Sequence, residues 1–378
     1  MTGSKTILGG GITIDLGAIT RNWKALDTIA GQALTGAVLK ADAYGTGADV
    51  VGRALYQAGA RFFFVATPDE GVSLRRALPQ AHIFVLDGLV PRTAADYAAH
   101  NLMPVLASMS QLTEWLDFCL NQGRAVPAAL HFDTGFNRVG FRAKEAELVR
   151  RELDQSGFEP QMIMSHFACA DQPANEMTRK QNGVFQGLLN MFPDIPASIA
   201  NSAAVMTSKD YHYQMVRPGI AMYGGQALNA RPNPMARVIS MHVPILQIKE
   251  PRIGETVGYG AAYRLRRDTK LAILAIGYAD GYFRALSGIG GQIGGRVAVN
   301  GTVVPVLGRV SMDMTAIDIT DVDGLVQPGD LVELLGPTIS IDDVADSART
   351  IGYEILTNLN GRFPRSYVNV PEGLDIHD

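Results

Sequence analysis

The stretch Val38-Leu39-Lys40-Ala41-Asp42-Ala43-Tyr44-Gly45-Thr46-Gly47 decides the fold, because it sets a lysine between an apolar run and a glycine-containing turn. Residues 33–39 read as a short buried strand, and apolar residues recur at helical spacing after Gly47. A strand, a short loop and a helix make a βα unit, and catalytic groups gather at the C-terminal ends of such strands in α/β barrels. A lone lysine at a strand end usually just extends to solvent. Here Lys40 stands where a cofactor amine would be placed.

The composition indicates a globular protein of two domains. The chain has 378 residues, of which 47% are hydrophobic and 19% charged. A net charge of −4 argues against nucleic-acid and acidic-membrane partners, which require clustered Lys and Arg. The N-terminus lacks the apolar core of a signal peptide, and no run approaches the roughly 18 apolar residues of a membrane span. We therefore expect a cytoplasmic protein with no membrane partner. Its two cysteines, Cys119 and Cys169, form no disulfide framework, and Cys119 fits a core position.

Short apolar runs alternate with amphipathic stretches over residues 12–240, which predicts an N-terminal (β/α)8 TIM-like barrel. The strand candidates are 12–15, 33–39, 62–65, 83–86, 103–106, 128–132, 162–164, 198–199 and 215–216. Residues 241–378 predict a smaller, mostly β domain, which the first eleven residues are candidates to join. Its strand candidates are 243–248, 271–276, 297–299, 303–307, 317–319 and 331–334. The glycine-rich run 288–295 lacks the context of a phosphate loop and predicts a hairpin or loop instead.

The Lys40 stretch closely resembles the pyridoxal-phosphate lysine motif of bacterial alanine racemases. Further segments resemble the family in the same order, over roughly residues 12–370: 130–140, 164–171, 201–204, 216–224, 257–263, 276–281, 308–313 and 353–365. The resemblance implies an isomerase that interconverts L-alanine and D-alanine with pyridoxal 5'-phosphate on Lys40. It also implies a supply of D-alanine for bacterial cell-wall peptidoglycan.

The resemblance implies cofactor roles for several barrel residues. Arg138 would contact the cofactor's phenolic oxygen and the substrate carboxylate, and arginine suits this because its planar fork binds carboxylates in bidentate fashion. His166 would lie beside the cofactor ring, and Arg217 would face the pyridine nitrogen. An arginine there donates a hydrogen bond and leaves the nitrogen unprotonated, which disfavours side reactions that need a long-lived carbanion. The remaining implied cofactor contacts are Tyr44, Asn201, Ser202, Gly219 and Ile220, with the Ser202 hydroxyl and the last two amides around the phosphate.

Racemisation needs two bases on opposite faces of the substrate's Cα. The resemblance implies that Lys40 serves one face and Tyr259 of the partner subunit the other, in a homodimer with shared active sites. Tyr278, Met312 and Asp313 would contact the substrate. Asp171, Arg284 and Arg309 match positions that border the entrance corridor.

Two departures from the family pattern stand out. His131 occupies the place, two residues before Asp133-Thr134-Gly135, where many members have a lysine that forms a carbamate with carbon dioxide. Imidazole cannot form that carbamate, so the group that steadies Arg138 must come from elsewhere. Gly361 falls where some members carry a tyrosine, and this difference predicts a wider gate and a broader substrate range.

The sequence pattern also leaves other classes of protein open. A broader-specificity amino-acid racemase, acting for example on serine, has the same signature. A fold-type III decarboxylase has a similar architecture but usually a Cys-Asp-Gly-type motif in its β domain, and this chain has no cysteine after Cys169. His131, Asp133 and His166 follow strand ends and offer a metal-binding alternative. A non-catalytic cofactor-binding barrel is disfavoured by the β domain with its Tyr259.

Overall fold

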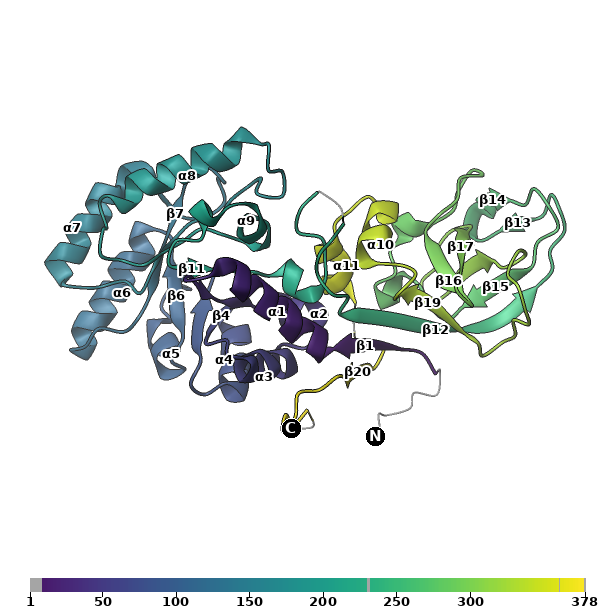
Figure 1. Ribbon diagram of the computed structural model, residues 1–378, viewed down its shortest axis with the longest axis horizontal. Helices are drawn as coiled ribbons and strands as arrows, with labels where there is room; N and C mark the ends of the chain where they lie inside the picture. The colour runs from purple at the N-terminus through teal and green to yellow at the C-terminus, as the bar shows by residue number, and fades with distance from the viewer. Residues whose placement is uncertain (1–8, 230–231, 360, 377–378) are drawn as a thin grey trace. The chain divides into compact units, whose positions relative to one another are not determined.

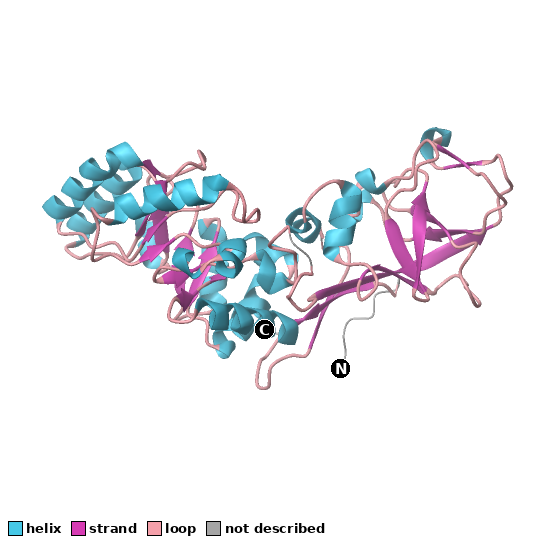
Figure 2. Cartoon of the chain, turned by 45° about the horizontal axis from the view of Figure 1, so that its top comes forward, coloured by secondary structure: helices cyan, strands magenta, loops and turns pink. Residues whose placement is uncertain are grey.

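The computed structural model describes residues 9–229, 232–359 and 361–376. The chain divides into two compact units, which are described separately. The barrel unit contains Ile19–Met222 and Gln226–Met235, and the C-terminal unit contains Ala236–Glu372, Tyr223–Gly225 and the N-terminal segment up to Ala18. In Figure 2 the barrel unit is rich in helices around its strands, whereas the C-terminal unit is dominated by strands.

The barrel unit is built on a curled parallel sheet with the hydrogen-bonded order β10-β9-β7-β6-β5-β4-β3. β11 pairs in parallel with β2, which directly precedes β3 in the chain. The Gln214 N–H donates to the Ala197 carbonyl at 3.1 Å and the Arg217 N–H to the Ala200 carbonyl at 2.9 Å, which joins β11 to β10. The ring therefore closes as a barrel. Its strands are β2 (Leu34–Thr35), β3 (Ala37–Val38), β4 (Phe62–Val65), β5 (His82–Val85), β6 (Met103–Leu106), β7 (Ala129–Asp133), β9 (Ile163–Met164), β10 (Ala197–Ser198) and β11 (Met215–Val216), with β8 (Phe141–Arg142) paired to β7.

Helices surround these strands in Figure 1. The strands are apolar because helices cover one face and barrel-interior side chains fill the other; Phe63, Phe64 and Val65 of β4 are all fully buried. The helices are α1 (Leu16–Ala30), α2 (Lys40–Gly45), α3 (Ala48–Ala58), α4 (Pro68–Ala77), α5 (Ala94–Ala99), α6 (Met109–Gln122), α7 (Ala146–Ser156), α8 (Glu176–Leu189) and α9 (Ser202–Thr207). The 3₁₀ helices are η1 (Ala143–Glu145), η2 (Lys209–Tyr211) and η3 (Ile220–Tyr223).

The C-terminal unit contains a mixed, largely antiparallel sheet with the order β15-β18-β17-β16-β19-β12-β1-β20. Its strands are β1 (Gly11–Asp15), β12 (Ile239–Lys249), β15 (Leu271–Leu274), β16 (Arg296–Val299), β17 (Thr302–Leu307), β18 (Thr315–Asp318), β19 (Leu331–Leu335) and β20 (Arg365–Val368), beside the hairpin β13 (Thr256–Val257) and β14 (Tyr263–Arg264). Its helices are α10 (Ile341–Ala348), α11 (Gly352–Asn358), η4 (Tyr259–Ala261), η5 (Tyr278–Asp280) and η6 (Arg284–Leu286).

The first strand corrects one sequence-based assignment. The apolar pattern predicts residues 12–15 as a barrel strand, but β1 pairs antiparallel with β12 and parallel with β20 in the sheet of the C-terminal unit. Its burial alternates, with Ile12 and Ile14 buried and their neighbours partly exposed. Such alternation is typical of a sheet with one solvated face rather than of a barrel strand.

The predicted α/β architecture, a TIM-like barrel followed by a mostly β domain, is otherwise confirmed. Strand predictions at 62–65, 103–106 and 215–216 match β4, β6 and β11. Residues 288–295 form a loop, held in part by the Gly295 N–H, which donates to the Leu286 carbonyl at 2.8 Å. Within the described part of the chain, none of the helices has the length and apolarity needed to cross a membrane.

Candidate active site

Lys40 begins a left-handed turn at the C-terminal end of β3. Ala41, Asp42, Ala43 and Tyr44 have φ between 52° and 56° and ψ between 39° and 51°, the mirror image of an ordinary helical turn. For residues with a Cβ this conformation costs about 1–2 kcal/mol each. Strain of this kind persists only where surrounding contacts enforce it, and it clusters at functional sites.

The carboxylate of Glu70 is one such contact. One oxygen accepts the Ala41 N–H at 2.7 Å, and the other accepts the N–H groups of Ala66 at 2.8 Å and Thr67 at 3.4 Å. Glu70 also closes the capping box of α4 with the Thr67 side chain. The same side chain therefore caps a helix and fixes the start of the lysine turn. The capping pattern Thr67-x-x-Glu70 is visible in the sequence, but its link to Lys40 depends on the fold.

Glu70→Gln is expected to loosen the lysine turn. An amide has one acceptor oxygen where the carboxylate has two, so at least one of the three N–H groups loses its partner at a cost of about 1 kcal/mol. Because Glu70 also raises the pKa of Lys40, the pH midpoint for labelling of Lys40 by an amine reagent should fall in the cofactor-free protein. Asp69→Asn removes the same charge one residue away and serves as the control. An equal change in both variants would contradict a specific role for Glu70.

The Lys40 amine lies in a positive and partly buried environment. Burial lowers its pKa, and Arg138 lowers the pKa further, against smaller opposing effects of Asp87 and Glu70. An unprotonated amine is the nucleophile that forms a Schiff base with a carbonyl. The barrel thus prepares Lys40 for attachment of an aldehyde cofactor.

His131, His166 and the buried Arg217 interact electrostatically, and His166 also interacts with Lys40. Burial lowers the pKa of His131 to about 4, with further lowering by Arg217 and Arg138. Burial likewise lowers the pKa of His166 well below its usual range, with the same arginines, His131 and Lys40 adding to the effect. Arg217 is 4% exposed and donates to the Ser165 carbonyl at 2.6 Å and to the Ser198 hydroxyl. Burial lowers the pKa of Arg217 to about 9, so the guanidinium stays charged at neutral pH.

The remaining barrel residues make a cradle that fits the phosphate of pyridoxal phosphate. The Ser202 Oγ accepts the N–H groups of Gly219 at 2.8 Å and Ala221 at 3.3 Å, which leaves its own proton to donate to an anion. A Cβ on Gly219 would come within 2.3 Å of the Tyr44 hydroxyl oxygen, so the backbone approach here needs glycine. Asn201 uses its Oδ1 to cap α9 through the Ala204 N–H at 3.0 Å, and Ile220 begins η3.

In the C-terminal unit, the structure brings three predicted substrate contacts together. The Tyr278 N–H donates to the Ser311 carbonyl and the Ala279 N–H to the Met312 carbonyl, both at 3.0 Å. Asp313 accepts from Arg362 at 2.9 Å. Tyr259 lies on η4 in the same unit, and its side chain is 72% exposed.

The residues predicted to border the entrance corridor belong to both units. Asp171 lies in the barrel unit, where it accepts from the Asn229 amide at 3.2 Å. Arg284 begins η6, and Arg309 packs against Gly260 of the Tyr259 turn, both in the C-terminal unit. A Cβ on Gly361 would meet open space within 4 Å, so the effect of this departure stays a prediction.

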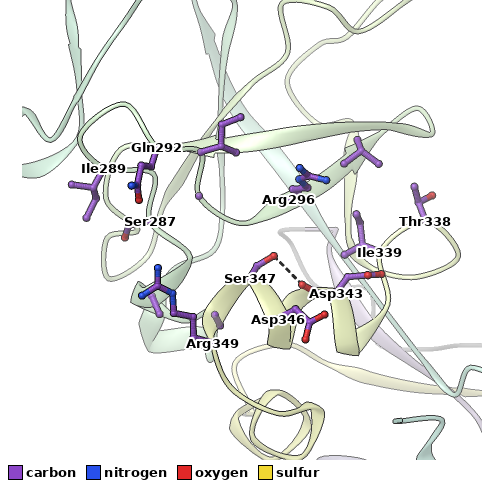
Figure 3. A pocket seen from close by; sticks show the side chains of 15 residues that line it. Ser287, Ile289, Gln292, Arg296, Thr338, Ile339, Asp343, Asp346, Ser347 and Arg349 are labelled. Atoms are coloured by element: carbon purple, nitrogen blue, oxygen red, sulfur yellow. Dashed lines mark hydrogen bonds between the residues drawn. The ribbon is translucent and has the colours of Figure 1, made fainter. Parts of the chain in front are cut away.

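The C-terminal unit also contains a large cavity. It has a volume of about 820 Å³ and is lined by Arg296, Arg349, Asp343 and Ser347 among others, as Figure 3 shows. Asp343 is occupied in the cap of α10, where it accepts from Ser340, and its carbonyl accepts the Ser347 hydroxyl. None of the predicted site residues lines this cavity.

The comparisons with known proteins agree with these observations. Residues 14–227 match the model of the alanine racemase N-terminal domain, and residues 238–367 match that of the C-terminal domain. The chain belongs to the alanine racemase family. The family predicted from the Lys40 stretch is therefore confirmed.

Similar proteins cover nearly the whole chain. An alanine racemase described as biosynthetic, from Agrobacterium fabrum, is 44% identical over 94% of this chain and 93% of its own length. An alanine racemase described as catabolic, from the same organism, is 41% identical over 95% of this chain and 92% of its own length. The crystal structure of alanine racemase from Bartonella henselae, with covalently bound pyridoxal phosphate, has a TM-score of 0.90 at 35% identity, over 95% of this chain and 99% of that one.

The metal-binding alternative gains no support. In the ranges that the structure describes, no group of three His, Cys, Asp or Glu side chains is placed to hold a metal ion. Asp133, the carboxylate of that alternative, accepts hydrogen bonds from the backbone N–H groups of the following turn.

Proposed function

We propose that Lys40 and Tyr259 of the partner subunit move the α-proton of alanine on opposite faces of the substrate. As a member of its family, the chain is an alanine racemase that uses pyridoxal phosphate. When bound, the cofactor withdraws electrons from the substrate's Cα and acidifies its C–H bond. The observation that carries the proposal is the lysine amine at the end of β3, whose pKa is lowered by burial and Arg138.

Within the barrel unit, each candidate polar group has a proposed task. Lys40 attaches the cofactor and then acts as a base at Cα. The Ser202 hydroxyl and the Ile220 N–H hold the phosphate, while Gly219, whose N–H donates to Ser202, allows the close backbone approach, with Tyr44 and Asn201 beside them. Arg138 holds the substrate carboxylate, His166 lies beside the cofactor ring, and Arg217 donates to the pyridine nitrogen. Arg217 has spare N–H groups for this after its bonds to Ser165 and Ser198.

The C-terminal unit contributes its residues to the other subunit of a symmetric homodimer. Tyr259, Tyr278 and Met312 are 72%, 44% and 53% exposed in their own unit, a high exposure for aromatic and thioether side chains. A two-fold interface makes each such residue available to a partner's barrel. In this arrangement Tyr278, Met312 and Asp313 contact the substrate together with Tyr259 of the partner subunit.

We also propose a cytoplasmic location. Both cysteines are free thiols, with Cys119 buried and Cys169 partly buried. Unpaired cysteines fit a reducing compartment, where disulfides do not persist.

The proposed activity can be tested by exchange of the substrate's α-proton in deuterium oxide. L-Alanine should lose its α-proton signal while its optical activity falls to zero, and D-alanine should do the same. L-Serine, tested alongside, should react more slowly if alanine is the preferred substrate. Release of carbon dioxide from any amino acid would instead favour the decarboxylase alternative.

Arg217→Glu is expected to change the course of the reaction. A carboxylate at this position would keep a proton on the pyridine nitrogen, which strengthens electron withdrawal and prolongs the life of the carbanion. Some alanine should then leave its amino group on the cofactor as pyridoxamine phosphate and depart as pyruvate, up to one per bound cofactor, measured with lactate dehydrogenase. Arg217→Lys keeps the charge and should yield no pyruvate. Equal pyruvate from both variants would show that Arg217 does not face the nitrogen.

A further inference from the structure

Arg138 is the one predicted carboxylate-binding group whose support is unexplained. The carbamate of many family members is excluded at His131, and this imidazole is neutral because burial lowers its pKa to about 4. Among residues 9–229, 232–359 and 361–376, no ion pair or side-chain hydrogen bond involves Arg138. An arginine placed to orient a substrate needs such support, because a displacement of about 1 Å can lower the rate about 10²-fold.

Asp133, five residues before Arg138, does not supply it. One oxygen of Asp133 accepts the N–H groups of Gly135 and Phe136, both at 2.8 Å, and the other accepts the Asn137 N–H at 3.0 Å. The side chain is therefore occupied in shaping the turn that leads to Arg138. Gly135 and Asn137 have φ of 130° and 58°, so the turn also depends on left-handed positions on both sides of Phe136.

Phe136 is the group that contacts Arg138. The guanidinium carbon lies 4.2 Å from the centroid of the Phe136 ring, well within the range of a cation–π interaction. The ring also contacts His166 in an edge arrangement, at a centroid distance of 5.8 Å and an interplanar angle of 62°. The ring thus contacts both the guanidinium and the His166 imidazole, and the Phe136 N–H is fixed by the Asp133 carboxylate.

We propose that Phe136 is a positioning residue that replaces the missing anionic support of Arg138. The inference rests on the proposed function of Arg138 in binding the substrate carboxylate. An anion would steady the guanidinium by taking up some of its N–H donors. A ring face steadies it by attraction to the π-system and leaves the in-plane fork free for a bidentate contact with the substrate. On this view, His131 removes the anionic support of Arg138, and the Phe136 ring supplies a different support.

Fluorinated phenylalanines at position 136 test this directly. Mono-, di- and trifluorination withdraw electron density from the ring with little change in volume, so the cation–π attraction falls in steps. We expect kcat/KM for alanine and the affinity for propionate, measured by calorimetry on the cofactor-loaded protein, to fall in the same steps, by about two- to fivefold in all, because Arg138 is an exposed cation. Phe136→Leu should match the trifluorinated protein, and Phe136→Tyr should retain wild-type behaviour. The same series at Phe118, which packs on Trp115 at 5.8 Å with no cation, is the control and should change nothing.

Repeating the fluorination series in the Arg138→Gln variant tests whether its effect depends on the Arg138–Phe136 contact. In Arg138→Gln the affinity for propionate should be low and independent of fluorination at 136, because the cation is gone. A continued decline in that background would overturn the inference. So would activation of the wild type by bicarbonate or chloride, since either would indicate an ionic support. If propionate affinity follows fluorination but alanine is not racemised, the inference stands and the proposed function fails.

Discussion

Lys40→Ala is expected to abolish both racemisation and the yellow colour of the protein loaded with pyridoxal phosphate. The side chain is the proposed attachment point and one of the two bases, so the loss in kcat should exceed about 10³-fold. The fold should survive, because Lys40 is only partly buried and its neighbours in the turn are held by Glu70 and by the Ala43 N–H, which donates to the Leu39 carbonyl. Visible spectra, borohydride reduction and peptide mass spectrometry measure the result.

Lys24→Ala is a suitable control, because Lys24 is exposed on α1 in the same unit. It should retain colour and activity. Added methylamine should restore part of the activity of Lys40→Ala, since a small amine can take the place of the missing side chain. A cofactor fixed by borohydride to any other lysine would contradict the assignment.

The sequence predicts the barrel well because its signal is local. Buried parallel strands are short apolar runs, and those at 62–65, 103–106 and 215–216 match β4, β6 and β11. The strand at 12–15 was correctly predicted as a strand but assigned to the wrong sheet. Its partners β12 and β20 lie more than two hundred residues away in the chain, and apolar pattern does not encode such pairing.

In the candidate site, the sequence identifies the functional residues but not the contacts that position them. Lys40, Arg138, His166 and Arg217 could be named because their motifs resemble a family, whereas the groups that hold them could not. In the left-handed turn over 41–44, only Asp42 is of a residue type that is enriched at positive φ, so the sequence does not predict four such residues in a row. The contact of Arg138 with the Phe136 ring depends on the path of a turn, which the residue types alone do not define. Residue identity thus points to chemistry, while positioning depends on tertiary contacts.

Mixed dimers of Lys40→Ala and Tyr259→Phe are expected to recover activity that neither variant has alone. If the two bases come from different subunits, each homodimer carries a defect in both of its sites. Joint unfolding and refolding in equal amounts makes about half of the dimers mixed in a symmetric two-fold assembly. A mixed dimer has one site with both defects and one site with none.

Activity should therefore return to roughly a quarter of the wild-type value, which is half of the dimers times half of their sites. The exposed position of Tyr259 in its own unit motivates this expectation. Refolding each variant by itself is the control and should recover almost nothing. Mass spectrometry under non-denaturing conditions establishes whether mixed dimers formed. If they are abundant and inactive, both bases belong to one chain, and the proposal that Tyr259 acts in the partner's site is wrong.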